Sequence, residues 1–301
     1  MSSIIPGLTS SAAIRALSTA NIANLTTEDM AALTSSQFSW LTTAQIGAIT
    51  VENIASLTST TQLAGLSSAQ VGGLKTAQVA ALSSDALPAL SNSVIAAFKT
   101  SAIIALTQDQ VGALSSDQLV ALTTAQYGAL TTHQIGALNS DDLSVLQTAD
   151  VRALKSAVVA ELNSAQIAGL TSAGIAALTT SQLTALDKEL FTTGLTTAQI
   201  QTLTTAQAAG LTSAQVQSLS TDNLQAMETA DLRALKTNVI SALSSDQIKA
   251  LTSTQLSALS TGQMAALNSD ALENLTSAQL AGMTSAQIAG LNTAQIAALS
   301  T

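Results

Sequence analysis

The chain is marked first by what it lacks. Its 301 residues include no cysteine, one histidine, two prolines and very few aromatic side chains, and only 9% of its residues are charged. The absence of cysteine excludes disulfide bonds and thiolate sites, and a single histidine excludes the usual His/Cys metal centres. With so few aromatic residues, any core must be built from aliphatic side chains and alanine.

Positive charge is also scarce. Nine basic residues stand against eighteen acidic ones, which gives a net charge of −9. No basic run could neutralise phosphates, so we expect no nucleic-acid partner. No apolar run approaches the roughly 20 residues needed to span a bilayer, so we expect no membrane insertion. The first residues, Met1 to Pro6, lack the basic and apolar regions of a signal peptide, so the sequence does not indicate classical export.

What the chain has in abundance is an eight-residue repeat, which we call the octad. Position one is an anchor, usually Leu, and the consensus continues as Thr/Ser, Thr/Ser, Ala/Asp, Gln, an aliphatic residue, a variable residue and Ala. The anchor recurs from Leu8 to Leu299. Three units have nine residues instead of eight, at 8–17, 57–66 and 186–195. No linker separates them, so we predict a single continuous array over residues 1–301.

The octad period excludes one long helix, because eight residues advance about 800°, or 80° beyond two full turns, and the anchors would spiral around the axis. A short helix restarted in every octad fits instead. Position two supplies an N-cap hydroxyl and position five a Gln three residues later, as in Thr42 with Gln45 and Thr196 with Gln199. This is the capping box, and the position-one and position-six aliphatics form a hydrophobic staple.

A helix from position three to position eight is too short to be stable alone in water. Its stability must come from stacking, with positions one and six in the core and the small position-eight residue allowing close approach. We therefore predict an all-α fold, a solenoid or superhelix of very short helices with one helix per octad. The pattern leaves the handedness and the number of octads per turn open.

No residue pattern indicates catalysis. His133 occupies position four, which is typical of a solvated face, and Tyr127 replaces a position-six aliphatic and should lie in the core. The adjacent Asp141 and Asp142 have no visible acid or nucleophile partner. Ser and Thr without an activating base are inert. We predict that the protein is not an enzyme and holds no cofactor or metal.

Five residues are candidates for assembly or contact. Trp40 stands in a position-eight Ala slot, either as a bulky plug for the N-terminal units or as an exposed contact residue. Lys99, Lys155 and Lys236 replace the N-cap residue, which predicts weaker helices there or a separate role. The block 138–155 resembles 219–236, 81 residues later, through block duplication or a recurring contact. Leu299 ends a complete apolar octad, with no polar cap after it.

Units such as Leu-Thr-Thr-Ala-Gln-Ile at 41–46 and 195–200 resemble the low-complexity repeat regions of large bacterial surface or secreted proteins that are described as adhesin-like. The resemblance covers essentially the whole chain and implies an extracellular or cell-surface location. The chain differs from such proteins in having no recognisable export signal, anchor or separate adhesive domain.

Two functions from different classes follow. The first is a structural extracellular protein that self-associates into a filament, sheath or surface layer, because open ends of identical units stack unless they are capped. The expected partner is then a second copy of the chain. The alternative is an adhesin stalk or binding scaffold, in which the array is an elongated spacer and the lysine units contact a cell surface or a polysaccharide.

Overall fold

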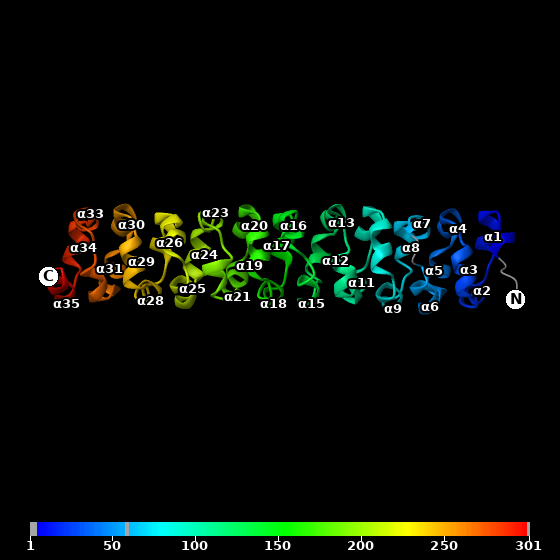
Figure 1. Ribbon diagram of the computed structural model, residues 1–301, viewed down its shortest axis with the longest axis horizontal. Coiled ribbons are helices and arrows are strands. Elements are labelled where there is room, and N and C mark those ends of the chain that lie inside the picture. The colour runs from blue at the N-terminus through cyan, green and yellow to red at the C-terminus, as the bar shows by residue number, and fades with distance from the viewer. Residues whose placement is uncertain (1–4, 58–59, 300–301) are drawn as a thin grey trace. The chain divides into compact units, whose positions relative to one another are not determined.

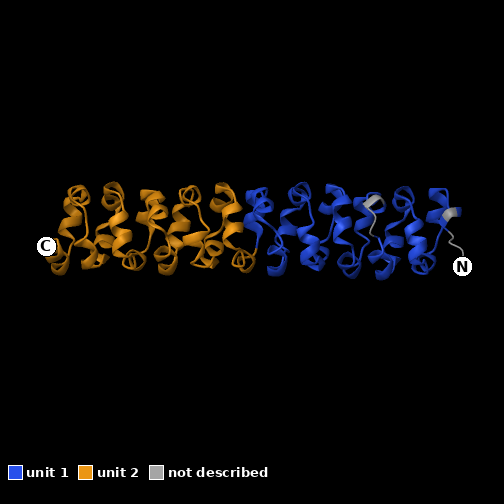
Figure 2. Cartoon of the chain, in the orientation of Figure 1, with its two compact units in different colours: residues 1–154 blue, residues 155–301 orange. Residues whose placement is uncertain are grey.

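The structure is a computed structural model that describes residues 5–57 and 60–299. The described residues are helical, and no strand occurs among them. They fall into two compact units, Met1–Leu154 and Lys155–Thr301, which are coloured separately in Figure 2. Each unit is described by itself below. The prediction of one continuous array over 1–301 stays a prediction.

In unit 1 every helix is short, and in Figure 1 the helices follow one another around a common core. The elements are η1 (Ile5–Gly7), α1 (Ser11–Arg15), α2 (Thr19–Ala23), α3 (Thr27–Ala32), α4 (Ser35–Trp40), α5 (Thr43–Ala48), α6 (Val51–Ala55), α7 (Thr60–Leu63), α8 (Ser68–Val71), α9 (Thr76–Ala80), η2 (Ser84–Ala89), α10 (Asn92–Ala96), α11 (Thr100–Ala105), α12 (Gln108–Gly112), α13 (Ser116–Ala121), α14 (Thr124–Tyr127), α15 (Thr132–Ile135), α16 (Ser140–Ser144) and α17 (Thr148–Ala153).

Unit 2 repeats this arrangement with one helix per octad. Its elements are α18 (Ser156–Val159), α19 (Ser164–Gly169), α20 (Ser172–Ala177), α21 (Thr180–Ala185), α22 (Leu190–Thr193), α23 (Thr197–Ile200), α24 (Thr205–Gly210), α25 (Ser213–Gln217), α26 (Thr221–Ala226), α27 (Thr229–Ala234), α28 (Thr237–Ile240), α29 (Ser245–Ala250), α30 (Ser253–Ala258), α31 (Thr261–Ala266), α32 (Ser269–Leu272), α33 (Ser277–Gly282), α34 (Ser285–Ala289) and α35 (Thr293–Ala298). The predicted all-α solenoid is confirmed.

The capping box starts most helices as the sequence predicts. In α5 the Gln45 backbone N–H donates to Thr42 Oγ1 at 3.3 Å, and the Thr42 N–H donates to Gln45 Oε1 at 2.7 Å. Thr42 itself is extended, with φ −75° and ψ 160°, so it ends the preceding segment and begins the helix. The next anchor, Ile49, returns to extended backbone and ends the helix after position eight. Each octad thus encodes its own start and stop.

The nine-residue units absorb their extra residue in different places. In 8–17 it lies before the helix, so that Ser10 and not Thr9 is the N-cap. In 186–195, α22 has no side-chain cap at Glu189, and both Leu190 and Phe191 are buried. In 57–66, residues 58–59 lie outside the described residues. A further irregularity is η2, a 3₁₀ segment that contains Pro88; proline removes a helical donor and clashes with the preceding turn.

The core of each unit is made by the anchors and the position-six aliphatics, as the staple predicts. In unit 2, for example, Ile167 is fully buried and Leu170 is 3% exposed. Helices contact the third helix further along the chain, as in α2 with α5 and α24 with α27. Hydrogen bonds between side chains and backbone join residues 25 to 32 apart. A turn of the superhelix therefore takes between three and four octads.

Small position-eight residues allow neighbouring turns to approach closely, again as predicted. Gly73 shows this most directly, because a Cβ placed there would overlap the Thr43 carbonyl oxygen. At Gly47, at position seven, a Cβ would lie 2.8 Å from the Gly73 carbonyl oxygen. Substituting alanine for Gly73 would therefore force the two turns apart.

Candidate functional site

The most regular feature of both units is a buried glutamine at position five. Gln199 is 2% exposed, and its Oε1 accepts the Thr196 N–H at 2.9 Å, which completes the capping box of α23. Its Nε2 donates to the carbonyl oxygens of Ile167 at 2.8 Å and Leu170 at 2.7 Å, one superhelical turn earlier. One side chain thus caps the start of its own helix and the end of a helix in the previous turn.

We call this series the glutamine ladder. Each member donates from Nε2 to the position-six and anchor carbonyls 28 to 32 residues earlier within its own unit. In unit 1 the members are Gln45, Gln62, Gln70, Gln78, Gln110, Gln118, Gln126 and Gln134. In unit 2 they are Gln199, Gln207, Gln215, Gln247, Gln255, Gln263, Gln279, Gln287 and Gln295.

From the sequence these glutamines are predicted to serve the capping box alone, and the structure gives them a second role that this prediction lacks. A signal for it is present in the sequence. A capping box accepts Glu as readily as Gln at this position, yet no octad carries Glu at position five. Only the amide has donor hydrogens besides its acceptor oxygen. The absence of Glu therefore indicates that most octads favour a position-five residue that can donate as well as accept.

Two octads carry aspartate in the ladder position without a side-chain hydrogen bond from the N-cap residue, and they belong to the blocks that recur after 81 residues. In unit 1, Asp150 is buried, and Thr124 Oγ1 donates to its Oδ1 at 2.9 Å. Burial raises the pKa of Asp150, while the hydrogen bonds from Thr124 and from the Gln147 backbone lower it. Asp150 cannot donate an amide hydrogen to the previous turn. Tyr127, buried as predicted, donates from its hydroxyl to the Leu119 carbonyl oxygen there at 2.8 Å.

In unit 2, Asp231 occupies the same position and is 2% exposed. Burial raises its pKa most, a hydrogen bond with the Thr205 side chain lowers it, and the nearby Glu228 charge raises it again. Its Oδ2 has no hydrogen-bond partner among the described residues. The residue that corresponds to Tyr127 is Ala208, so no hydroxyl serves the previous turn here.

Residues 8–32 and residues 275–299 differ at positions five and six. We call residues 8–32 the first turn and residues 275–299 the last turn. In the first turn the position-five residues are Ala13, Asn21 and Asp29, and the ladder begins only with the octads that follow. In the last turn the position-five residues are all buried ladder glutamines, but the aliphatics at position six lose their cover. Ile288 is 47% exposed and Ile296 is 44% exposed.

The predicted contact residues are dispersed. Trp40 ends α4 and is half-buried, and its carbonyl oxygen accepts the Arg15 Nε–H at 3.2 Å. Leu299 is half-buried at the end of the last turn. These residues share no site, and whether any of them makes an intermolecular contact stays a prediction.

Lys99, Lys155 and Lys236 are exposed N-cap residues of α11, α18 and α28, and none of them makes a side-chain cap. In these octads position five is Ala102, Val158 or Val239, all buried and apolar. A lysine has no acceptor oxygen for the capping bond. In these three octads the capping hydroxyl and the glutamine are both absent, and apolar packing takes their place; the octad of Lys75, in contrast, keeps the ladder glutamine Gln78.

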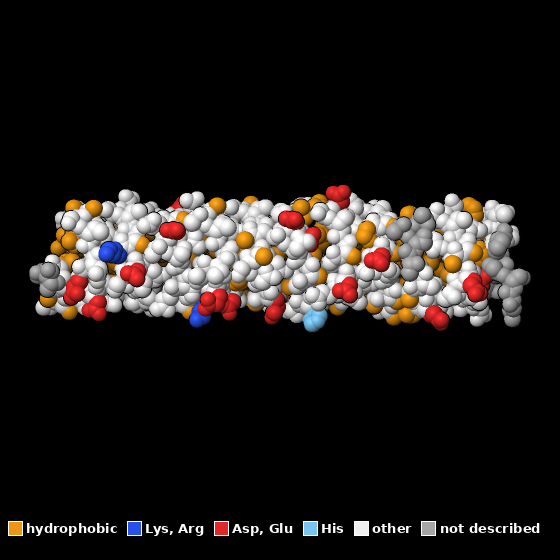
Figure 3. All heavy atoms as spheres, in the orientation of Figure 1, with side chains coloured by type: hydrophobic (Ala, Val, Ile, Leu, Met, Phe, Trp, Pro, Cys, Tyr) orange, Lys and Arg blue, Asp and Glu red, His pale blue; other side chains and the backbone are white. Residues whose placement is uncertain are grey.

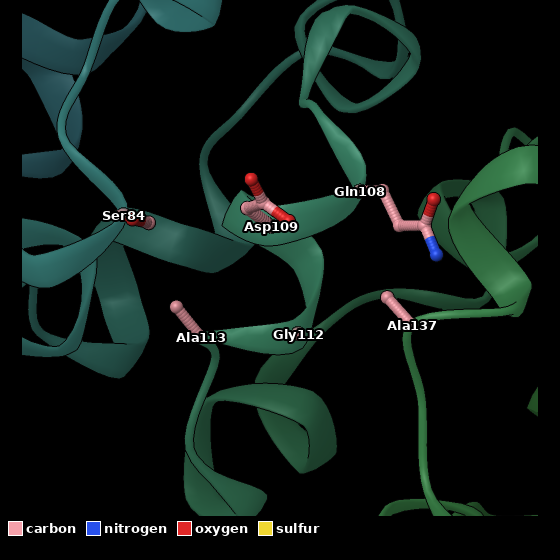
Figure 4. A pocket seen from close by; sticks show the side chains of 6 residues that line it. All are labelled: Ser84, Gln108, Asp109, Gly112, Ala113 and Ala137. Carbon is pink, nitrogen blue, oxygen red and sulfur yellow. The ribbon is translucent and has the colours of Figure 1, made fainter.

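The charged side chains of the described residues are dispersed over the surface. Figure 3 shows acidic groups scattered among neutral side chains and backbone on one face. No group of three or more His, Asp or Glu side chains that could hold a metal occurs within 5–57 and 60–299, and His133 is exposed. A shallow hollow in unit 1 is lined by Ser84, Gln108, Asp109, Gly112, Ala113 and Ala137 (Figure 4). It combines one carboxylate with small side chains and contains no basic residue.

Comparison with known proteins identifies the repeat. The ALTTAQ repeat family matches residues 10–35, 22–59, 59–84, 95–124, 114–148, 143–180, 224–261 and 264–301, well over half of the chain. No curated protein sequence matches the chain. The octad, the capping glutamine and the repeated matches in both units agree, and the chain belongs to the ALTTAQ repeat family.

Proposed function

We propose that the chain is a structural repeat protein of the cell surface that serves as a stalk or scaffold and not as an enzyme. The observation that carries this proposal is the glutamine ladder. The side chains that give the sequence its polar character, the position-two hydroxyls and the position-five amides, are used for hydrogen bonds within and between turns. Such an array can be lengthened by adding octads without adding reactive or binding groups, and this property suits a spacer.

The stalk is tested by the shape and binding of the purified protein. We expect small-angle scattering to give an elongated monomer, and replacement of Lys99, Lys155 and Lys236 by Thr to weaken adsorption to cell-wall polysaccharide while the circular dichroism spectrum stays helical. A compact particle would contradict the spacer, and unchanged adsorption would contradict a contact role for the lysines. Surface labelling of intact cells tests the location.

Self-association into a filament, sheath or surface layer is the second candidate, because identical solenoid units can stack end to end and Ile288 and Ile296 are exposed apolar side chains. Apolar side chains that are covered in every inner turn gain about 25 cal/mol per Å² when they are buried again. We expect electron microscopy over a concentration series to show filaments that disappear in an Ile288→Ser/Ile296→Ser variant. Single particles at every concentration would leave the stalk as the better description. No described helix is long and apolar enough to cross a membrane.

A further inference from the structure

Three consecutive octads of unit 2 carry no glutamine at position five. Their position-five residues are Asn223, Asp231 and Val239, and all three are buried. Only Asn223 has an amide, and its Nδ2 donates to Leu195 O at 3.0 Å. Since a turn of the superhelix takes between three and four octads, residues 219–242 make up most of a turn in which the glutamine ladder is broken. We call residues 219–242 the interrupted turn.

The octads before the interrupted turn keep carbonyl acceptors that the ladder would otherwise serve. A ladder glutamine that follows this turn binds the anchor carbonyl 28 residues earlier. The same spacing assigns Leu203 O to Asp231 and Leu211 O to Val239. Among the residues that the structure describes, no side chain donates to either oxygen. The buried hydrogen bonds of this interface are therefore reduced to those of Asn223.

The next interface along the chain is regular. Three glutamines each donate there to two carbonyl oxygens at 2.8 to 3.2 Å; they are Gln247, Gln255 and Gln263. At the interrupted turn, exposed groups make the remaining bonds. Ser213 Oγ donates to Asn238 O at 3.2 Å, and Gln217 Nε2 donates to Ala242 O at 2.8 Å. Water competes for exposed bonds of this kind, so they stabilise the interface less than buried ones.

Asp231 is the member of the interrupted turn whose hydrogen bonding depends on its protonation state. Its Oδ2 is buried and has no hydrogen-bond partner among the described residues, and the ladder register assigns it to Leu203 O. A carboxylate can only accept, whereas a protonated carboxyl group has an O–H that can donate as an amide does. Burial raises the pKa of Asp231 above the ordinary value of 3.8, so it holds its proton to higher pH than an exposed aspartate.

Few other charges act on Asp231. Its helix α27 packs against α24 and α30, and neither of these helices contains an ionisable side chain. The charge of Glu228, at the start of α27, raises the pKa of Asp231, and a hydrogen bond with Thr205 of α24 lowers it. The other charged side chains of the interrupted turn are exposed; they are Asp222, Arg233 and Lys236.

We propose that the interrupted turn is a pH-sensitive hinge of unit 2, whose interface with the preceding octads opens more readily than the regular interfaces and is closed by a proton on Asp231. With the proton bound, the carboxyl O–H donates to a carbonyl oxygen of the preceding octads in place of the glutamine amide. Without it, the carboxylate and the carbonyl oxygen are both buried acceptors with no donor between them, which is costly. The hinge therefore loosens as the pH rises, whatever the function of the array.

Buried cysteines can report the opening, because the chain has no cysteine of its own. Ile200→Cys places a thiol at the hinge interface, and Ile175→Cys places one where the ladder is intact and Gln207 donates to Ile175 O at 2.9 Å. Both isoleucines are at position six and are 0% exposed, so the two substitutions are matched. Labelling by 4,4′-dithiodipyridine is normalised to the rate in urea-unfolded protein at the same pH. Circular dichroism and thermal melting check folding.

We expect the thiol of Ile200→Cys to react at least about tenfold faster than that of Ile175→Cys near neutral pH. This ratio should fall at least about threefold as the pH is lowered to about 4. Adding Asp231→Asn, which keeps the side-chain shape and supplies an amide, should slow the labelling of Ile200→Cys near neutral pH and remove the pH dependence. The matched control Asp222→Asn, which removes an exposed carboxylate from the same turn, should change neither.

Equal labelling of the two cysteines near neutral pH would overturn the hinge. A pH dependence that persists in the Asp231→Asn background would overturn the role of Asp231. If either cysteine variant does not fold, hydrogen exchange of the unsubstituted chain decides the matter. The amides of α23 and α24 should then exchange at least about tenfold faster than those of α20 and α21 after correction for their intrinsic rates, and equal protection would contradict the proposal.

Discussion

The octads of Asp150 and Asp231 occupy matching places in two blocks of nearly the same sequence, 81 residues apart, yet their surroundings differ. In unit 1, Tyr127 donates to the Leu119 carbonyl at 2.8 Å. In unit 2 the corresponding residues are Ala208 and Ile200, so that donor is absent, and Asp231 Oδ2 has no partner among the described residues. An aspartate in place of a ladder glutamine therefore removes the amide donor. In unit 1 the Tyr127 hydroxyl of the neighbouring turn donates instead, and in unit 2 no such donor is present.

Removing the compensating side chain should have the largest effect. Tyr127→Ala places in unit 1 the residue that unit 2 has at the corresponding position, Ala208, and leaves a cavity, so we expect a loss of about 3–5 kcal/mol in unfolding free energy. Tyr127→Phe removes only the hydroxyl and should cost about 1–2 kcal/mol. Urea unfolding measures both, and hydrogen exchange should show the loss in unit 1. Equal costs for both variants would show that the hydroxyl contact carries the whole effect.

Restoring the donor in unit 2 should stabilise it. Asp231→Asn provides an Nδ2 that can bond the previous turn, as Asn223 Nδ2 does with Leu195 O at 3.0 Å. It also removes a buried carboxylate, so we expect a gain of about 1–2 kcal/mol at neutral pH. Asp150→Asn should gain less, because Thr124 and Tyr127 already complete that site. A loss of stability in Asp231→Asn would contradict this account.

The free energy of unfolding should depend on pH through Asp150 and Asp231, because a glutamine at the same position does not titrate. Burial raises the pKa of both Asp150 and Asp231 above the ordinary value of 3.8. A raised pKa means that the folded state binds protons more tightly than the unfolded state. Stability from this source is therefore full below 3.8 and is lost as pH rises through the raised pKa. The difference in unfolding free energy between wild type and Asp231→Asn should grow over that range and then level off.

The smallest effect is expected at Lys236, the last residue of the second block. Lys236→Thr supplies the missing N-cap hydroxyl of α28 and should stabilise by about 0.5–1 kcal/mol. Lys155→Thr at α18 should give the same gain, since both octads pair a lysine N-cap with a buried valine at position five. Thermal melting of the two variants measures this. A gain at only one of the two sites would show that the two lysine octads differ in their surroundings.

Most of the fold could be predicted because its determinants lie within one octad. The residues that form the Thr42–Gln45 capping box, and those that form the Leu–Ile staple, are only a few positions apart within one octad. The helix starts and the core positions can therefore be predicted from the eight-residue period. The number of octads per turn does not, because it depends on contacts between residues 25 to 32 apart. The second role of Gln199 was missed for the same reason, since its Nε2 partners lie in the previous turn.

The sites were harder to predict than the fold. Trp40 and the three lysines were chosen because they differ from the octad consensus. A difference from the consensus does not by itself indicate a functional role. Val158 and Val239 show that the lysine octads replace one stabilising arrangement by another.

The hydrogen bonds of the glutamine ladder also form in the order in which the chain is synthesised. Within the ladder, every glutamine Nε2 lies later in the sequence than the carbonyls that it binds, as Gln45 does relative to Ile14 and Leu17. During synthesis the amino-terminal octads emerge first, and each later turn then completes the one before it. The newest turn on the ribosome is always the one that still lacks its donors. The array is thus suited to growing by addition at one end, without rearranging the turns that have already formed.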